Sequence, residues 1–142
     1  MSPDTAAVRP GEELDLRRLG EYLAPVFGPQ SWQLEQFPGG HSNLTYLLKS
    51  PEREFVLRRA PLGPLPPKAH DMAREYNVLS LVHPVFAKAP AVYHLCTDAS
   101  IIGATFYLME RRHGVIHRDP SSIMFEARAH AEALVDTLIE LH

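Results

Sequence analysis

Cysteine is nearly absent from this sequence, because Cys96 is the only one among 142 residues. An internal disulfide is therefore impossible, and a reducing, cytoplasmic setting is the simplest expectation. Cys96 ends the strand-like run AVYHLC, so we interpret it as a small buried hydrophobic residue rather than as a nucleophile.

The sequence also lacks an excess of positive charge and any long apolar run. Its formal net charge is −3, which gives no global basic field to attract nucleic acid or an anionic membrane. No apolar run approaches the roughly 20 residues of a membrane-spanning helix, and MSPDTAAVRPGEELD lacks the plan of a signal peptide. Hydrophobic residues make up 45% and charged residues 22%, a balance typical of one soluble globular domain.

The spacing of apolar residues predicts two helices and five strands in the first 110 residues. In chain order they are a helix over 12–27, strands over 32–37, 44–50 and 54–60, a helix over 69–82, and strands over 91–96 and 104–110. The proline-rich segment 61–67 is predicted to be a stiff loop. This order predicts an α+β fold with a mainly antiparallel, five-stranded sheet and flanking helices.

A further helix is predicted over residues 125–141, with a wide apolar face. Its members are Ala127, Ala131, Leu134, Val135, Leu138, Ile139 and Leu141. Because the sheet already has a helix for one face, we expect this one to meet a partner, most simply in a homodimer through residues 125–141. Folding back over the open side of its own sheet is the competing expectation.

The turn between the first two strands has a composition suited to phosphate binding. It contains the residues Gly39, Gly40, His41, Ser42 and Asn43. Glycines let backbone N–H groups approach phosphate oxygens closely, and the Ser and Asn side chains can add donors. The alternative is an ordinary glycine-bearing hairpin that binds nothing.

A basic residue on the third strand and a glutamate on the next helix extend this pattern. Strand alternation places Arg58 and Arg59 on opposite faces of the sheet, and the register of FVLR predicts that Arg58 faces Glu75. Together with a glycine loop, such a pair holds ATP in a protein-kinase-like N-lobe. Residues 109–112 follow the last strand, where a hinge to a second lobe is expected.

Three stretches of the chain resemble the aminoglycoside phosphotransferase-like, or choline-kinase-like, branch of the protein-kinase-like fold. They are FPGGHSNLTYLL, FVLRRAPLGPLPPKAHDMAREYNVL and IIGATFYLMERRHGVIHRDP. The second is the most specific, because it joins the strand arginine, the proline loop and the helix glutamate in one run. The resemblance covers nearly the whole chain and is closest to the kinase-like domain fused to some acyl-CoA dehydrogenases.

This resemblance implies a nucleotide-binding N-lobe over 1–110, and a hinge, linker and first C-lobe helix over 111–142. It implies ATP and Mg²⁺ as cofactors, and transfer of the γ-phosphoryl group of ATP to a hydroxyl of a small molecule. Arg58 takes the phosphate-binding position and Glu75 is its partner. The hinge residues Met109, Glu110 and Arg112 are expected to hold the adenine edge.

The string HRD at 117–119 matches the kinase catalytic loop only in part. That loop has a metal-binding Asn five residues after its Asp, and here the position is Met124. The string also precedes the helix after which the resembled family carries its catalytic loop, so we interpret it as a linker. His113 and His117 lie in a segment unsuited to helix, which argues against a metal site.

We therefore expect this chain to lack the catalytic base and the Mg²⁺ ligands, and to bind ATP weakly without turnover. Two alternatives remain at this point. One is a catalytically dead interaction module that dimerises through the last helix, and the other is an unrelated α+β fold. The acceptor stays open, because the missing lobe would build its site.

Overall fold

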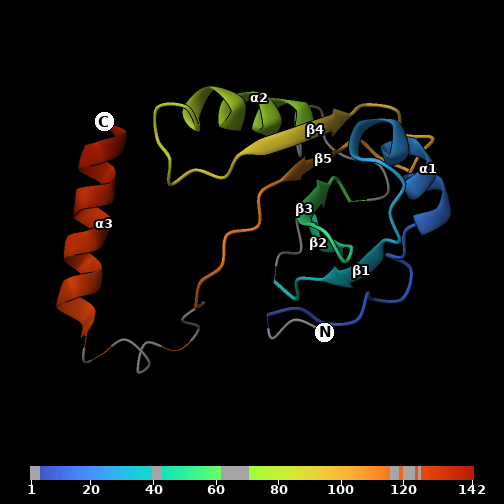
Figure 1. The fold of residues 1–142 in the computed structure, drawn as a ribbon. Coiled ribbons are helices and arrows are strands. Elements are labelled where there is room, and N and C mark those ends of the chain that lie inside the picture. Colours follow the sequence, from blue (N-terminus) through green and yellow to red (C-terminus); the bar gives the residue numbers. More distant parts are fainter. Residues whose placement is uncertain (1–3, 40–42, 62–70, 116–118, 120–123, 125) are drawn as a thin grey trace.

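The sheet of the molecule has five strands in the order β1-β2-β3-β5-β4 (Figure 1). The computed structural model describes residues 4–39, 43–61, 71–115, 119, 124 and 126–142. The strands are β1 (Gln33–Gln36), β2 (Leu44–Lys49), β3 (Glu54–Arg59), β4 (Val92–Cys96) and β5 (Phe106–Met109). Every neighbouring pair is antiparallel, which confirms the predicted α+β fold and its sheet.

Helix α1 (Leu16–Phe27) covers one face of the sheet and begins later than the predicted residue 12. The earlier start is wrong because Asp15 caps the helix, its carboxylate accepting the N–H of Arg18 at 3.0 Å. Glu12 lies outside the helix, and its carbonyl accepts the hydroxyl of Tyr46 at 2.7 Å. The segment before α1 is thereby attached to β2.

The main core lies between α1 and the sheet. Its buried side chains are apolar and aromatic, and they include Leu19, Leu23, Trp32, Tyr46, Phe55, Leu57, Phe106 and Leu108. The opposite face has a smaller cluster around Ala60, Met72 and Tyr107. The hydrophobic core is therefore larger on the α1 face than on the opposite face, and we call the opposite face the shallower one.

Helix α2 (Met72–Val82) lies over this shallower face. Asp71 caps it by accepting the N–H of Arg74 at 2.9 Å, and the predicted start at residue 69 lies outside the described residues. Met72 is buried, but Val78 is half exposed and Leu81 is exposed. The helix therefore packs against the sheet through Met72, Tyr76 and Leu79, and its outer side is exposed.

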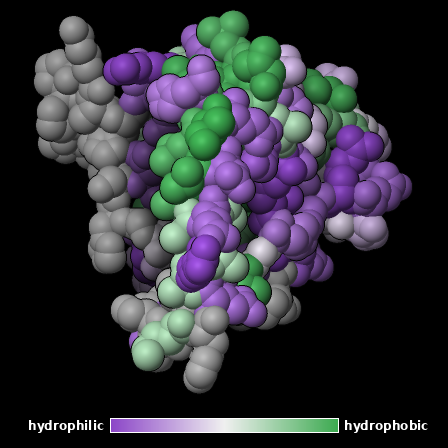
Figure 2. All heavy atoms as spheres, turned by 90° about the vertical axis from the view of Figure 1, so that its left-hand side faces the viewer, coloured by the Kyte–Doolittle hydropathy of each residue, from purple (hydrophilic) through white to green (hydrophobic). Residues whose placement is uncertain are grey.

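Helix α3 (Ala127–Leu141) stands apart from the sheet (Figure 1) and buries none of its residues. Lys88, in the loop before β4, donates to Glu140 at 2.5 Å and to Thr137 at 3.3 Å. Figure 2, in which α3 faces the viewer, shows hydrophobic side chains exposed on it among polar ones. The chain does not fold α3 back over its own sheet.

Within the described ranges, no helix has both the length and the apolar character that spanning a membrane requires.

Candidate functional site

The two consecutive arginines of β3 point to opposite faces of the sheet, as predicted. Nη2 of Arg58 lies 3.3 Å from Oε2 of Glu75 on α2, and the two side chains are 30% and 35% exposed. Arg59 is buried on the other face, where its Nη1 donates to the carbonyl of Ile102 at 2.9 Å. The prediction that Arg58 rather than Arg59 faces Glu75 is confirmed.

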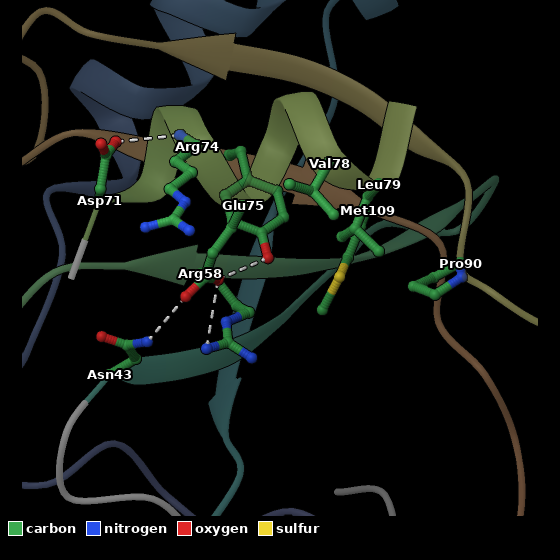
Figure 3. Close-up of a pocket in the computed structure, with 10 residues that line it drawn as sticks. Asn43, Arg58, Asp71, Arg74, Glu75, Val78, Leu79, Pro90 and Met109 are labelled. Carbon is green, nitrogen blue, oxygen red and sulfur yellow. Dashed lines mark hydrogen bonds and ion pairs between the residues drawn. The ribbon is translucent and has the colours of Figure 1, made fainter. Parts of the chain in front are cut away.

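Three residues from outside α2 contact the carboxylate of Glu75, namely Asn43, Arg58 and Tyr107. Asn43, which immediately precedes β2, donates its side-chain amide to Oε1 at 3.2 Å. Tyr107 on β5 donates its hydroxyl to Oε2 at 3.0 Å, the oxygen that Arg58 also approaches. Figure 3 shows Asn43 and Arg58 directed at Glu75 from below α2.

These side chains form one wall of a cavity of about 720 Å³ between α2 and the sheet (Figure 3). The cavity is lined by polar groups near the start of α2 and by apolar groups near its end. The lining residues are Asn43, Arg58, Asp71, Arg74, Glu75, Val78, Leu79, Pro90, Tyr107 and Met109. Such a mixture of apolar walls and a few converging polar groups is typical of a small-molecule site.

Two arginines give this cavity donors for an anionic ligand. Nε of Arg58 is buried and has no hydrogen-bond partner among the described residues. Arg74 precedes Glu75 on α2, and Figure 3 shows its guanidinium extending from the helix toward the side where Asn43 and Arg58 lie. Guanidinium groups are well suited to phosphate and carboxylate oxygens because their donors form a planar fork.

A second cavity, of about 370 Å³, lies next to the first. Pro90 and Met109 line both cavities, so the two are neighbours at the end of β5. The smaller one is also lined by Phe37, Thr45 and Val56, and by the residues that follow β5. Val56 and Met109 are paired across β3 and β5, which gives this cavity an apolar floor.

The residues after β5 fix this segment to the body of the domain. The backbone N–H of Glu110 donates to the carbonyl of Ala91 at 2.8 Å, and its carboxylate accepts the N–H of Ala91 at 3.0 Å. Arg112 donates to the carbonyls of Ala87 and Ala89 and to the carboxylate of Glu110. The Glu110 N–H is thus engaged and is not a free donor for an adenine edge.

Tyr107 is the residue of this site whose pKa is most clearly shifted. Burial raises the pKa of the Tyr107 hydroxyl, and the nearby Glu75 carboxylate raises it further, against the opposing effect of Arg58. The phenol therefore stays protonated and remains a donor to Glu75. Among the residues that the structure describes, no three His, Cys, Asp or Glu side chains gather as a metal site.

The structure brings together four of the predicted site residues, Asn43, Arg58, Glu75 and Met109, around the larger cavity. Gly39 is described and has open space where a side chain would lie. The predicted Gly40, His41 and Ser42 lie outside the described residues.

Arg74 and Tyr107 are among the lining residues of the cavity that sequence reasoning missed. Tyr107 alternates with Phe106 and Leu108 on its strand, which places it on the same face as Met109. That alternation was a usable signal. Its position beside Arg58 depends on the pairing of β3 with β5, in which these two residues are direct partners.

The comparisons with known proteins agree with this geometry. The model of the Phosphotransferase enzyme family matches residues 33–142. Acyl-CoA dehydrogenase family member 10 of Mus musculus is 39% identical over 122 residues, covering 84% of this chain and 11% of the relative. Family member 11 of Rattus norvegicus is 38% identical over 148 residues, covering 98% of this chain and 19% of the relative.

A solved structure is also similar in fold. It is a crystal structure of a protein assigned as an aminoglycoside phosphotransferase from Ralstonia eutropha JMP134, with a TM-score of 0.61 and 29% sequence identity. The match covers 75% of this chain and 30% of that one, and this chain spans 11% and 19% of the two curated relatives. The predicted resemblance is confirmed at the level of family and fold.

Proposed function

Because the chain belongs to the Phosphotransferase enzyme family, we propose that it is the ATP-holding portion of a small-molecule kinase. Such an enzyme transfers the γ-phosphoryl group of ATP to a substrate hydroxyl. The observation that carries this proposal is the Arg58–Glu75 pair, which lies at a cavity with unused guanidinium donors. A basic strand residue paired with a glutamate of the next helix is the phosphate-holding device of kinase-like folds.

The residues present fit ATP in two parts. Arg58 and Arg74 would hold phosphate oxygens in the larger cavity, where Nε of Arg58 is buried without a described partner. The smaller cavity, with Val56 and Met109 on its floor, would take the adenine. The two cavities meet at Met109, so one extended ligand can occupy both.

The residues described do not fit Mg²⁺ in the same way, since they form no carboxylate cluster. When bound, ATP supplies the phosphoryl group, and the side chains of this chain orient it and neutralise part of its charge. We propose that this chain on its own binds ATP without turnover. Binding is expected to be weaker than micromolar, because the Arg58 and Glu75 side chains are about one-third exposed and water competes for them.

The test is calorimetric titration of the full chain with ATP and with adenosine. We expect Arg58→Ala to lower ATP affinity about tenfold or more, since a hydrogen bond to a charged group is lost, and to leave adenosine binding unchanged. Arg17→Ala is the matched control, because Arg17 is an exposed arginine of α1 that pairs with Glu21 on the same helix. No ATP binding by the wild type, or equal binding by Arg58→Ala, would overturn the proposal.

A second function, an interaction module that dimerises through α3, is favoured by the exposed apolar face of that helix. Leu134, Val135, Leu138, Ile139 and Leu141 are 47% to 69% exposed. A row of exposed apolar side chains along one face of a helix is typical of an interface. Light scattering over a range of concentrations should then show a dimer for the wild type. The double variant Leu134→Glu, Ile139→Glu should be monomeric. A monomeric wild type would contradict this second function.

A further inference from the structure

The carboxylate of Glu75 is bound more closely by neutral donors than by its arginine. The hydroxyl of Tyr107 lies 3.0 Å from Oε2 and the amide of Asn43 3.2 Å from Oε1, whereas Nη2 of Arg58 lies 3.3 Å from Oε2. If the glutamate served only to neutralise Arg58, a shorter or two-pronged ion pair would be expected. The observed geometry suggests that Glu75 is held in place by the other two residues.

We propose that Tyr107 and Asn43 are positioning residues that hold the Glu75 carboxylate, so that Glu75 can present Arg58 to phosphate groups. This inference rests on the proposed function. It assigns different roles to these residues. Two neutral donors hold the glutamate in place, and the guanidinium of the arginine remains able to donate hydrogen bonds to the ligand.

Tyr107 is well placed for this role because its ring cannot move aside. It is 1% exposed, and its ring packs edge-on against Tyr76 of α2, with 6.2 Å between the ring centroids. Tyr107 is also the direct strand partner of Arg58, so both side chains leave the sheet side by side. Its hydroxyl is therefore aimed at Oε2 of Glu75 by the packing of the sheet.

Asn43 joins the same carboxylate from a third direction. It immediately precedes β2 and donates to Oε1, whereas Tyr107 and Arg58 approach Oε2. Both oxygens thus keep a donor when Arg58 turns toward a ligand. Without these two donors, that turn would leave a partly buried carboxylate unpaired, which is energetically unfavourable.

The variant that isolates the effect is Tyr107→Phe, which keeps the buried ring and removes the hydroxyl. We expect ATP affinity, measured by calorimetry, to fall about threefold to tenfold, and adenosine affinity to stay unchanged. Tyr46→Phe is the matched control, because Tyr46 is a buried sheet tyrosine whose hydroxyl donates to the carbonyl of Glu12 on the other face. That control should lower thermal stability without changing ATP affinity.

Introducing Tyr107→Phe into a Glu75→Ala variant distinguishes a positioning role of Tyr107 from a general effect on folding stability. If Tyr107 and Asn43 act through Glu75, then Tyr107→Phe and Asn43→Ala should cause no further loss of ATP affinity there. If the Asn43 amide contacted phosphate directly, Asn43→Ala would still lower ATP affinity in the Glu75→Ala background. Asn43→Ala, at a partly exposed position, also provides a reading if Tyr107→Phe folds poorly.

The outcomes are distinct from those of the proposed function. A wild type that binds no ATP overturns the proposed function, and this inference with it. A wild type that binds ATP, with Tyr107→Phe and Asn43→Ala binding equally well, overturns this inference alone. Parallel losses for ATP and adenosine, additive with Glu75→Ala, would mean that the two residues only stabilise the fold.

Discussion

Arg58 and Arg59 are the same residue type at consecutive positions of one strand, and the two faces of the sheet use them in opposite ways. Arg59 lies under α1, fully buried, with its guanidinium 5.8 Å from the centre of the Tyr46 ring and one hydrogen bond to Ile102. Arg58 lies under α2, partly open to solvent, beside a carboxylate and a cavity.

The difference lies in what surrounds each guanidinium. On the α1 face an aromatic ring and a carbonyl satisfy part of a cation that is closed off from solvent, so Arg59 serves packing. On the α2 face, Arg58 meets a carboxylate that also accepts hydrogen bonds from Asn43 and Tyr107, and Nε of Arg58 has no hydrogen-bond partner among the described residues. A deep core and a cavity lined by charged side chains thus lie on either side of a single strand.

The largest expected effect is on folding stability. Arg59→Ala should lower the free energy of unfolding by about 3 kcal/mol, or roughly 6–12 °C in melting temperature, because it opens a hole and leaves the Ile102 carbonyl unpaired. Arg58→Ala should change it by about 1 kcal/mol or less, since its ion pair is partly exposed. Urea unfolding of both variants checks this, and equal losses would erase the contrast between the faces.

A smaller effect, of known sign, is expected from His94 on the α1 face. His94 Nε2 lies 2.9 Å from the Tyr22 hydroxyl, and burial lowers the pKa of this histidine below its ordinary value of 6.5. Below about pH 6.5 the unfolded chain therefore takes up a proton that the folded chain resists, and stability falls as the pH drops toward the folded pKa.

The measurement is the free energy of unfolding between about pH 7.5 and 5.5 for wild type and for His94→Gln. We expect the wild type to lose stability over this window relative to the variant. His130→Gln, on exposed α3, is the control and should keep the wild-type slope. A wild type and a His94→Gln protein with parallel pH profiles would contradict the prediction.

The smallest effect is expected on the open face, at Arg74. Arg74→Ala should lower ATP affinity only about twofold to fivefold, and the difference should shrink at high salt, because Arg74 is exposed and its attraction to phosphate is screened by water and salt. Adenosine affinity and stability should not change. Arg128→Ala serves as the control, since that arginine is 92% exposed and pairs with Glu132 on α3. Insensitivity of the difference to salt would indicate a direct, desolvated contact instead.

Local patterns in the sequence were enough to predict the elements and the split between the two arginines. Strand periodicity separates Arg58 from Arg59 without any knowledge of their neighbours. The start of α1 was misplaced because apolar spacing continues past the cap that Asp15 provides. Residues that meet only through pairing of distant strands, such as Tyr107 with Arg58, could not be placed from local pattern alone.

The segment after β5 gives another example of a long-range arrangement. Arg111 was placed at a hinge, but its side chain is buried and bonded to Asp4 and to Glu54, each at 2.8 Å. Asp4 is more than a hundred residues away in the chain, so no local pattern could reveal the pair. The resemblance to a family supplied the roles of Arg58 and Glu75, and the structure supplied their neighbours.

The isolation of α3 has a consequence for the exchange of its backbone hydrogens. A helix of 15 residues with no buried side chain, bonded to Lys88 only near its C-terminal end in the part of the chain that the structure describes, relies mainly on its own hydrogen bonds, and in water such a helix opens readily. Its amide hydrogens should be replaced by deuterium within seconds, while those of β2, β3 and β5 persist as long as the fold does. Protection of α3 that grows with protein concentration would identify the state in which another molecule covers it.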